Sequence, residues 1–174
     1  MSKHCGIRAF LACLLLGAST LLFAAPQEQT AVAEVVIGRV EMSKASSNKW
    51  RTVKTGAKIR HRDQLRTFAG AQLEVKLANG SQLMIQENSL VDMSELLEEN
   101  GHLKNTVQVK KGKVLFNIKK LSSAQSSFLF ETPTATAAIR GTEGAVAVLS
   151  NGLVAYLQSG RMEIRDRSGK VLGL

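Results

Sequence analysis

The sequence predicts an all-β fold, built from many short strands in a sandwich or a solenoid-like wrap, with little helix. Apolar and polar residues alternate in short runs, as a half-buried strand requires; residues 71–77 read AQLEVKL. Turn residues recur about every ten positions. Four strand starts share a glycine, a basic residue and an apolar residue, at Gly38, Gly112, Gly160 and Gly169. Their spacing is irregular, so no tandem repeat is predicted.

Residues 1–24 have the layout of a secretory signal peptide, with Lys3 and Arg8 ahead of an apolar run. That run is of marginal length for a membrane span, which needs about 20 residues. We expect cleavage after Ala24 and export to the periplasm, whereas a retained leader would anchor the chain to the membrane.

Both cysteines, Cys5 and Cys13, lie in this leader, so burial alone must hold the exported part together. The formal net charge is +9. A basic chain suits anionic partners, and export favours cell-wall polymer or anionic lipid over nucleic acid. Lysines and arginines scattered over exposed strand positions for solubility are the simpler explanation.

The predicted organisation is a loose N-terminal segment at 25–34 and one domain at 35–174. The first strand is expected over residues 33–42, with a bulge or close approach at Gly38. Trp50, the only tryptophan, begins the next strand, residues 50–59. It is either a stacking platform for a ligand or a residue of the core or rim.

Residues 60–63, Arg-His-Arg-Asp, are predicted to form a turn whose backbone amides bond Asp63. His61 beside Asp63 would suit acid–base chemistry in a hydrolase. No serine or cysteine nucleophile stands at a recognisable elbow to accompany it, so no catalytic residue is predicted.

A β-hairpin is predicted next, from residues 71–77 and 81–85, with a type I′ turn at Asn79-Gly80. The acidic residues 86–100 do not alternate strictly, and we expect Asp92 or Ser94 to cap a turn of helix there. These carboxylates lack the spacing of a calcium loop, so no metal site is predicted.

Residues 106–120 are predicted to hold two strands joined near Gly112. Lysines form the densest basic patch of the chain here, either to hold a polyanion or to protect an exposed edge: Lys110, Lys111, Lys113, Lys119 and Lys120.

The segment 128–147, FLFETPTATAAIRGTEGAVA, organises the C-terminal half. Its first residues alternate as in a half-buried strand, which Pro133 ends because proline has no amide hydrogen. A tight corner is expected at 140–143, where Arg140 pairs with Glu143 or bonds turn carbonyls. Further strands are predicted at 144–149, 153–158 and 161–166.

The run TPTATAAIRGTE resembles the signature of the FecR-type domain. Other matching pieces stand upstream in the same order, and Arg62 occupies a position where the family has glycine: Gly38-Arg39-Val40, Trp50 with Gly56, Asp63-Gln64-Leu65-Arg66-Thr67, Leu77 to Ser81, and Val107 to Val114. The resemblance covers residues 35–160.

This resemblance implies signalling, because FecR-type proteins relay a signal from an outer-membrane transducer to a sigma factor inside the cell. Only residues 1–8 precede the apolar run, so we expect a stand-alone module without the cytoplasmic sigma-regulating region. The predicted function is a non-enzymatic periplasmic or envelope module for protein interaction or signalling, which binds an envelope or outer-membrane protein by strand addition. No cofactor, nucleic acid or small-molecule substrate is expected.

The predicted contact residues lie around the corner, together with the tryptophan: Thr132, Pro133, Arg140, Gly141, Thr142, Glu143 and Trp50. The alternative is a domain that binds cell wall or polysaccharide through Trp50 and the lysine patch.

Overall fold

The computed structural model describes residues 25–44, 47–121, 123–149 and 152–173. The predicted signal peptide, with both cysteines, lies outside the described residues, as do residues 150–151 between the strands predicted at 144–149 and 153–158. All regular elements of the described ranges are strands, which confirms the all-β prediction. No helix among the described residues has the length and apolar character to cross a bilayer. The strands are β1 (Gln27–Glu28), β2 (Thr30–Ile37), β3 (Val40–Lys44), β4 (Arg51–Thr52), β5 (Lys58–Arg60), β6 (Asp63–Thr67), β7 (Gln72–Lys76), β8 (Gln82–Ile85), β9 (Leu90–Glu99), β10 (His102–Asn117), β11 (Ser127–Glu131), β12 (Ala135–Leu149), β13 (Gly152–Asp166) and β14 (Val171–Gly173).

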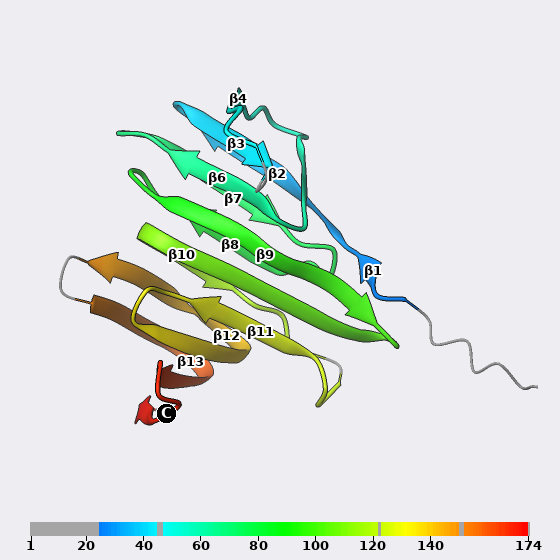
Figure 1. Ribbon diagram of the computed structural model, residues 1–174, viewed down its shortest axis with the longest axis vertical. Coiled ribbons are helices and arrows are strands. Elements are labelled where there is room, and N and C mark those ends of the chain that lie inside the picture. Colours follow the sequence, from blue (N-terminus) through cyan, green and yellow to red (C-terminus); the bar gives the residue numbers. More distant parts are fainter. Residues whose placement is uncertain (1–24, 45–46, 122, 150–151, 174) are drawn as a thin grey trace, which may run out of the picture.

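These strands join in one hydrogen-bonded sheet that folds over itself into two layers. The front layer runs β4-β3-β6-β9 and continues through the first half of β10 to β11 and the first half of β12 (Figure 1). The back layer runs β5-β2-β7-β8 and continues through the second halves of β10 and β12 to the first half of β13. The core lies between them, with Leu65 and Val91 of the front layer and Leu83 and Ile85 of the back layer fully buried.

Three long strands pass from one layer to the other at a glycine: β10 at Gly112, β12 at Gly141 and β13 at Gly160. The glycine-plus-base pattern of the sequence therefore marks a common backbone conformation, since Gly38, Gly112, Gly160 and Gly169 all have positive φ. A glycine in this conformation redirects the backbone while the chain remains in the sheet. For this reason the two strands predicted within 106–120 are one bent strand.

The N-terminal prediction was wrong, because residues 25–34 are not loose. Gln27 pairs with Glu98 of β9, and β2 lies between β5 and β7. The inward-facing residues at the start of this strand are the buried alanines Ala31 and Ala33. Because alanine is only weakly apolar, its alternation with the neighbouring residues gives a weak strand pattern. The predicted strand 33–42 is divided at Gly38 into β2 and β3, and the predicted strand 50–59 is reduced to β4 and β5.

The helical turn predicted within 86–100 was also wrong, because this segment is the ten-residue strand β9. Val91, Met93 and Leu96 are its buried residues, and the step from Met93 to Leu96 breaks the period of two. The pairing with β10 shows a register shift at that step. A β-bulge therefore hid the strand pattern.

The β7–β8 hairpin is confirmed, but its turn differs from the prediction. Gly80 has a φ of 79° and Asn79 does not have positive φ, while the amide of Gly80 donates to the carbonyl of Leu77 at 2.9 Å. This is a three-residue loop with glycine in the last position. Positive φ at two consecutive residues occurs instead at Asn100 (52°) and Gly101 (76°), between β9 and β10.

Candidate functional site

The Thr132-Pro133 turn joins β11 to β12. The Thr132 hydroxyl accepts a hydrogen bond from the amide of Ala135 at 3.1 Å and lies 2.9 Å from the carbonyl oxygen of the same residue. Thr132 is buried and Pro133 is exposed. Within the predicted contact set, Thr132 therefore serves the turn, and Pro133 remains available to a partner.

The corner at 140–143 is built on Thr142, which is buried within the bend of β12. Its hydroxyl lies 2.8 Å from the Arg140 carbonyl and accepts from the Arg161 amide at 3.2 Å, so it ties β12 to β13. The Arg140 guanidinium donates to the carbonyl of Ala124 at 2.5 Å. This contact is neither of the two predicted for Arg140, because Ala124 lies in the loop before β11 and not in the corner itself.

Two hollows flank this corner. Arg140 and Gly141 line the first, of about 340 Å³, together with residues of the preceding loop such as Lys120 and Ala124. Glu143 and Gly144 line the second, a larger groove of about 590 Å³ on the outer face of the back layer. The corner therefore adjoins a groove that no pattern in the sequence predicted.

This apolar groove crosses four strands. Met84 of β8, Leu115 of β10, Ala145 of β12 and Tyr156 of β13 are successive cross-strand neighbours along it. A row of small residues, with Ala147 beside Ala145, lies between larger side chains on both sides, which explains the hollow shape. Three charged residues also line it: Glu74, Lys113 and Glu143.

The unbroken apolar run GAVAVL at 144–149 is typical of a buried strand, but this segment of β12 is only partly buried. Val146 is buried, whereas Leu149 is 53% exposed. Alanine alternates with valine in this segment, which could have indicated a strand with one exposed face. The pattern was overlooked because alanine is apolar and occurs in the core as well as on exposed faces.

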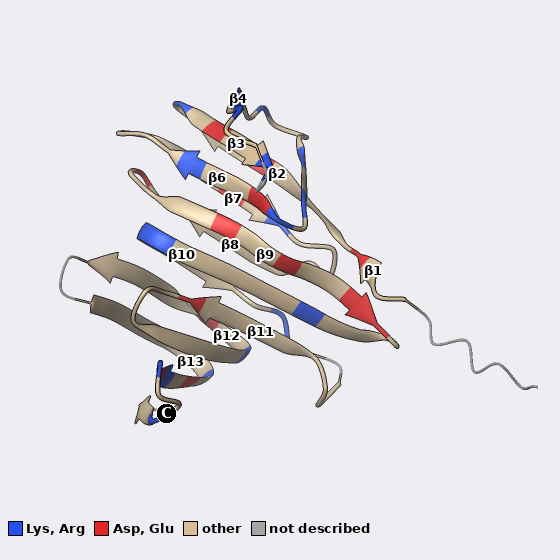
Figure 2. Ribbon diagram, viewed as in Figure 1, with Lys and Arg blue, Asp and Glu red and all other residues tan. Residues whose placement is uncertain are grey.

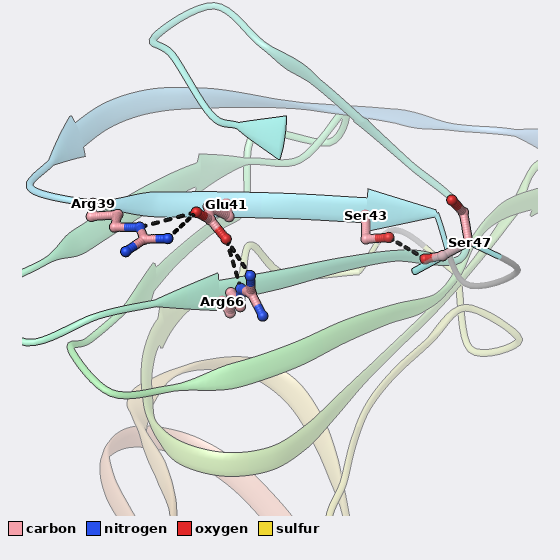
Figure 3. A network of polar contacts seen from close by, with 5 residues as sticks. All are labelled: Arg39, Glu41, Ser43, Ser47 and Arg66. Atoms are coloured by element: carbon pink, nitrogen blue, oxygen red, sulfur yellow. Dashed lines mark hydrogen bonds and ion pairs between the residues drawn. The ribbon is translucent and has the colours of Figure 1, made fainter. Parts of the chain in front are cut away.

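Trp50 belongs to a different part of the molecule. The guanidinium carbon of Arg66 lies 3.9 Å from the centroid of the Trp50 ring, a cation–π distance. Arg66 also donates its Nε hydrogen to Glu41 at 2.8 Å, and Arg39 donates to the other oxygen of that carboxylate at 3.0 Å (Figure 3). These hydrogen bonds, from Arg39 and Arg66, lower the pKa of Glu41.

In this cluster of Trp50, Arg66, Glu41 and Arg39, Glu41 belongs to β3 and Arg66 to β6. Both strands lie several strands away from the corner in the sheet order. The structure does not bring Trp50 together with the other predicted contact residues.

The lysine patch is divided. Lys110, Lys111 and Lys113 lie next to Gly112 at the bend of β10. Lys119 and Lys120 come after Asn117, where β10 ends. Lys110 also pairs with Asp92 at 2.7 Å. The patch that supported polymer binding is therefore not one continuous surface.

The His61–Asp63 pair belongs to the predicted turn. The Asp63 carboxylate accepts from the Arg60 amide at 2.9 Å and pairs with Lys44 at 2.7 Å, which confirms its role in the turn. Arg62 has a φ of 61°, so it adopts the left-handed conformation that glycine prefers. In the described ranges, no group of three or more metal-ligating side chains gathers.

Comparison with known proteins gives one family and two solved folds. The model of a family described as FecR protein matches residues 63–163, more than half of the chain. No match is found among curated proteins.

Two crystal structures from Parabacteroides distasonis ATCC 8503, each described as that of a "putative anti-sigma factor", are similar to this chain. The first shares 16% identity with a TM-score of 0.51, and the second 15% with a TM-score of 0.49. Each comparison covers 63% of this chain and 49% of the other, so this chain spans about half the length of those it matches. At this identity the likeness concerns the fold.

Proposed function

Because the chain belongs to the FecR protein family, we propose that it is an exported, non-enzymatic signalling module that acts by contact with another protein of the cell envelope. The signal-peptide layout of residues 1–24 supports export to the periplasm. The partner in this proposal is an envelope or outer-membrane protein, and the contact surface is the corner at 140–143 together with the apolar groove.

The apolar groove is the observation that carries this proposal. Contiguous exposed apolar surface is uncommon on a soluble domain unless it binds something. Here Leu115 and Tyr156 stand in a hollow of about 590 Å³ whose lining includes Glu143 of the corner. An apolar segment of a partner would fill the groove, where Glu143 supplies a polar contact, while Arg140 supplies one in the neighbouring hollow.

The experiment is capture from intact cells. The chain is tagged at its C-terminus, cross-linked in place and purified, and the captured proteins are identified. We expect one envelope protein with the wild type, and a loss of about tenfold or more with Leu115→Lys, which places a charge in the groove. Arg140→Glu should reduce capture at the corner.

Arg51→Glu is the matched control, because Arg51 is exposed on β4 at the far end of the front layer. Near-ultraviolet signals of Trp50 and thermal unfolding establish that each variant is folded. Equal capture by the wild type and both groove and corner variants would sink the proposal. Recovery of wall polymer alone, lost when Trp50 or the lysines are changed, would favour the polymer-binding alternative.

A further inference from the structure

One edge of the sheet lacks the protection that the other edges have. Within the described ranges, residues 152–159 of β13 pair with β12 alone, so their other side is open. Their sequence, GLVAYLQS, contains no charged residue. The other terminal strands carry or adjoin charged side chains: Glu28 in β1, Arg51 in β4, Lys58 and Arg60 in β5, and Lys170 before β14. Natural sheets usually protect an open edge with such charges.

The open edge is apolar on both faces. Val154 and Tyr156 point outward and are 51% and 63% exposed. Leu153, Ala155 and Leu157 point inward and are only partly buried against the core. A strand added here would gain backbone hydrogen bonds and cover both rows of side chains. In Figure 2 this arm of the β12–β13 hairpin is tan, whereas β9 and β10 carry bands of charge.

The pattern of the edge suits a second copy of the same strand. Antiparallel pairing about a twofold axis at Ala155 places Val154 opposite Tyr156 of the other copy, and Leu153 opposite Leu157. Aromatic residues opposite β-branched ones are favourable cross-strand pairs. Without Lys3 and Arg8 of the leader the net charge is 9 − 2 = +7, so two copies repel each other and contact is most favourable where charge is lacking. Such pairing closes on itself and covers this edge in both copies, so no third copy can add to it.

We infer that the protein forms a homodimer in which residues 152–159 of β13 pair antiparallel with the same residues of a second copy, with the twofold axis at Ala155. The back layers of the two copies become one continuous sheet. The two apolar grooves then adjoin across the axis, because Tyr156 lines the groove and also lies on the edge. This inference concerns self-association and does not depend on the proposed envelope partner.

The first test places charged residues at the edge and measures self-association. It uses the protein purified after export from the cells that make it. Sedimentation from about 1 to about 100 μM should show a monomer–dimer equilibrium for the wild type. Val154→Lys with Tyr156→Lys puts lysine opposite lysine and should weaken the dimer at least about tenfold. Val154→Lys with Tyr156→Glu puts lysine opposite glutamate and should restore it to within about threefold of the wild type.

Ile37→Lys is the control, because Ile37 is an exposed apolar residue on β2 at the opposite end of the back layer. It should leave the dimer unchanged. A wild type that remains monomeric, an Ile37→Lys variant that dissociates, or a failure of the lysine–glutamate pair to restore the dimer would each overturn the inference. A monomeric wild type that still captures an envelope protein would leave the proposed function standing alone.

The second test does not depend on the folding of charged variants. Residues 25–174 contain no cysteine. Opposite residues of an antiparallel pair have Cα atoms about 4.5 to 5.5 Å apart, within reach of a disulfide. Ala155→Cys should therefore give a covalent dimer on a non-reducing gel.

Gln158→Cys is the matched control, since its two copies would lie about 20 Å apart on either side of the axis. Equal cross-linking of the two variants, or none with Ala155→Cys, would contradict the inferred register.

Discussion

The bend of β10 offers the sharpest test of how this sheet folds over itself. Gly112 has a φ of 90°, and a Cβ atom built on it would lie 2.2 Å from the Ser89 Oγ and 2.6 Å from the Ser89 Cα. Gly112→Ala therefore combines backbone strain of about 1 to 2 kcal/mol with a steric conflict of about 1 to 3 kcal/mol. We expect a loss of about 3 kcal/mol from the free energy of unfolding, a large part of the about 5 to 15 kcal/mol typical of a domain.

Gly56→Ala separates the two effects. Gly56 has a similar φ of 84°, but no atom lies within 4 Å of its built Cβ, so only the strain of about 1 kcal/mol applies. Urea unfolding, followed by the fluorescence of Trp50, measures both variants. The difference of about 2 kcal/mol corresponds to a midpoint about 1 M urea lower for Gly112→Ala. Losses within about 0.5 kcal/mol of each other would refute the role of close approach at this bend.

Three further changes test other contacts. Thr142→Val leaves buried backbone groups of two strands without their hydroxyl partner and should cost about 1 to 3 kcal/mol in urea unfolding, whereas Thr134→Val, at an exposed position, should cost less than about 0.5 kcal/mol. The lowered pKa of Glu41 means that its stabilising effect is complete above the ordinary value of 4.5 and is lost as the pH falls through the folded-state pKa. The difference in unfolding temperature between wild type and Glu41→Gln should therefore shrink below pH 4.5, and a constant difference would contradict this. Phe130→Ala, within the aromatic cluster of the core, should cost about 3 to 5 kcal/mol by urea unfolding, and a loss near that of Leu129→Ala on the half-buried face would count against it.

Local features were predicted well where local chemistry decides them. A sharp change of direction needs positive φ, which glycine adopts most easily, so the recurring glycine at positions 38, 112, 160 and 169 correctly indicated where the chain changes direction. At Gly38 and Gly169 this is a turn between strands, whereas at Gly112 and Gly160 it is a bend within β10 and β13. The hairpin of β7 and β8 followed from alternation on either side of Asn79-Gly80. Asp63 was placed in its turn because its short side chain can bond amides nearby in sequence.

Prediction failed where pairing overrides local pattern. The strand β9 was mistaken for a helical turn because a bulge shifts its alternation by one residue, and a bulge exists only relative to its partner strand. Likewise, β1 gains its structure from β9, which lies about seventy residues later in the chain. Neither the bulge of β9 nor the pairing of β1 can be predicted from the residues of its own segment alone.

The all-β class, the positions of the glycine bends and the family signature at 132–143 can be predicted from the amino-acid sequence, because they depend on residue type and near neighbours. The groove and the open edge, in contrast, arise from the pairing of strands that are distant in the chain. Met84, Leu115, Ala145 and Tyr156 lie on four strands, and their apolar side chains form one surface only after the sheet has brought those strands into register. The outer position of β13 is likewise a property of strand order, which side-chain periodicity does not encode.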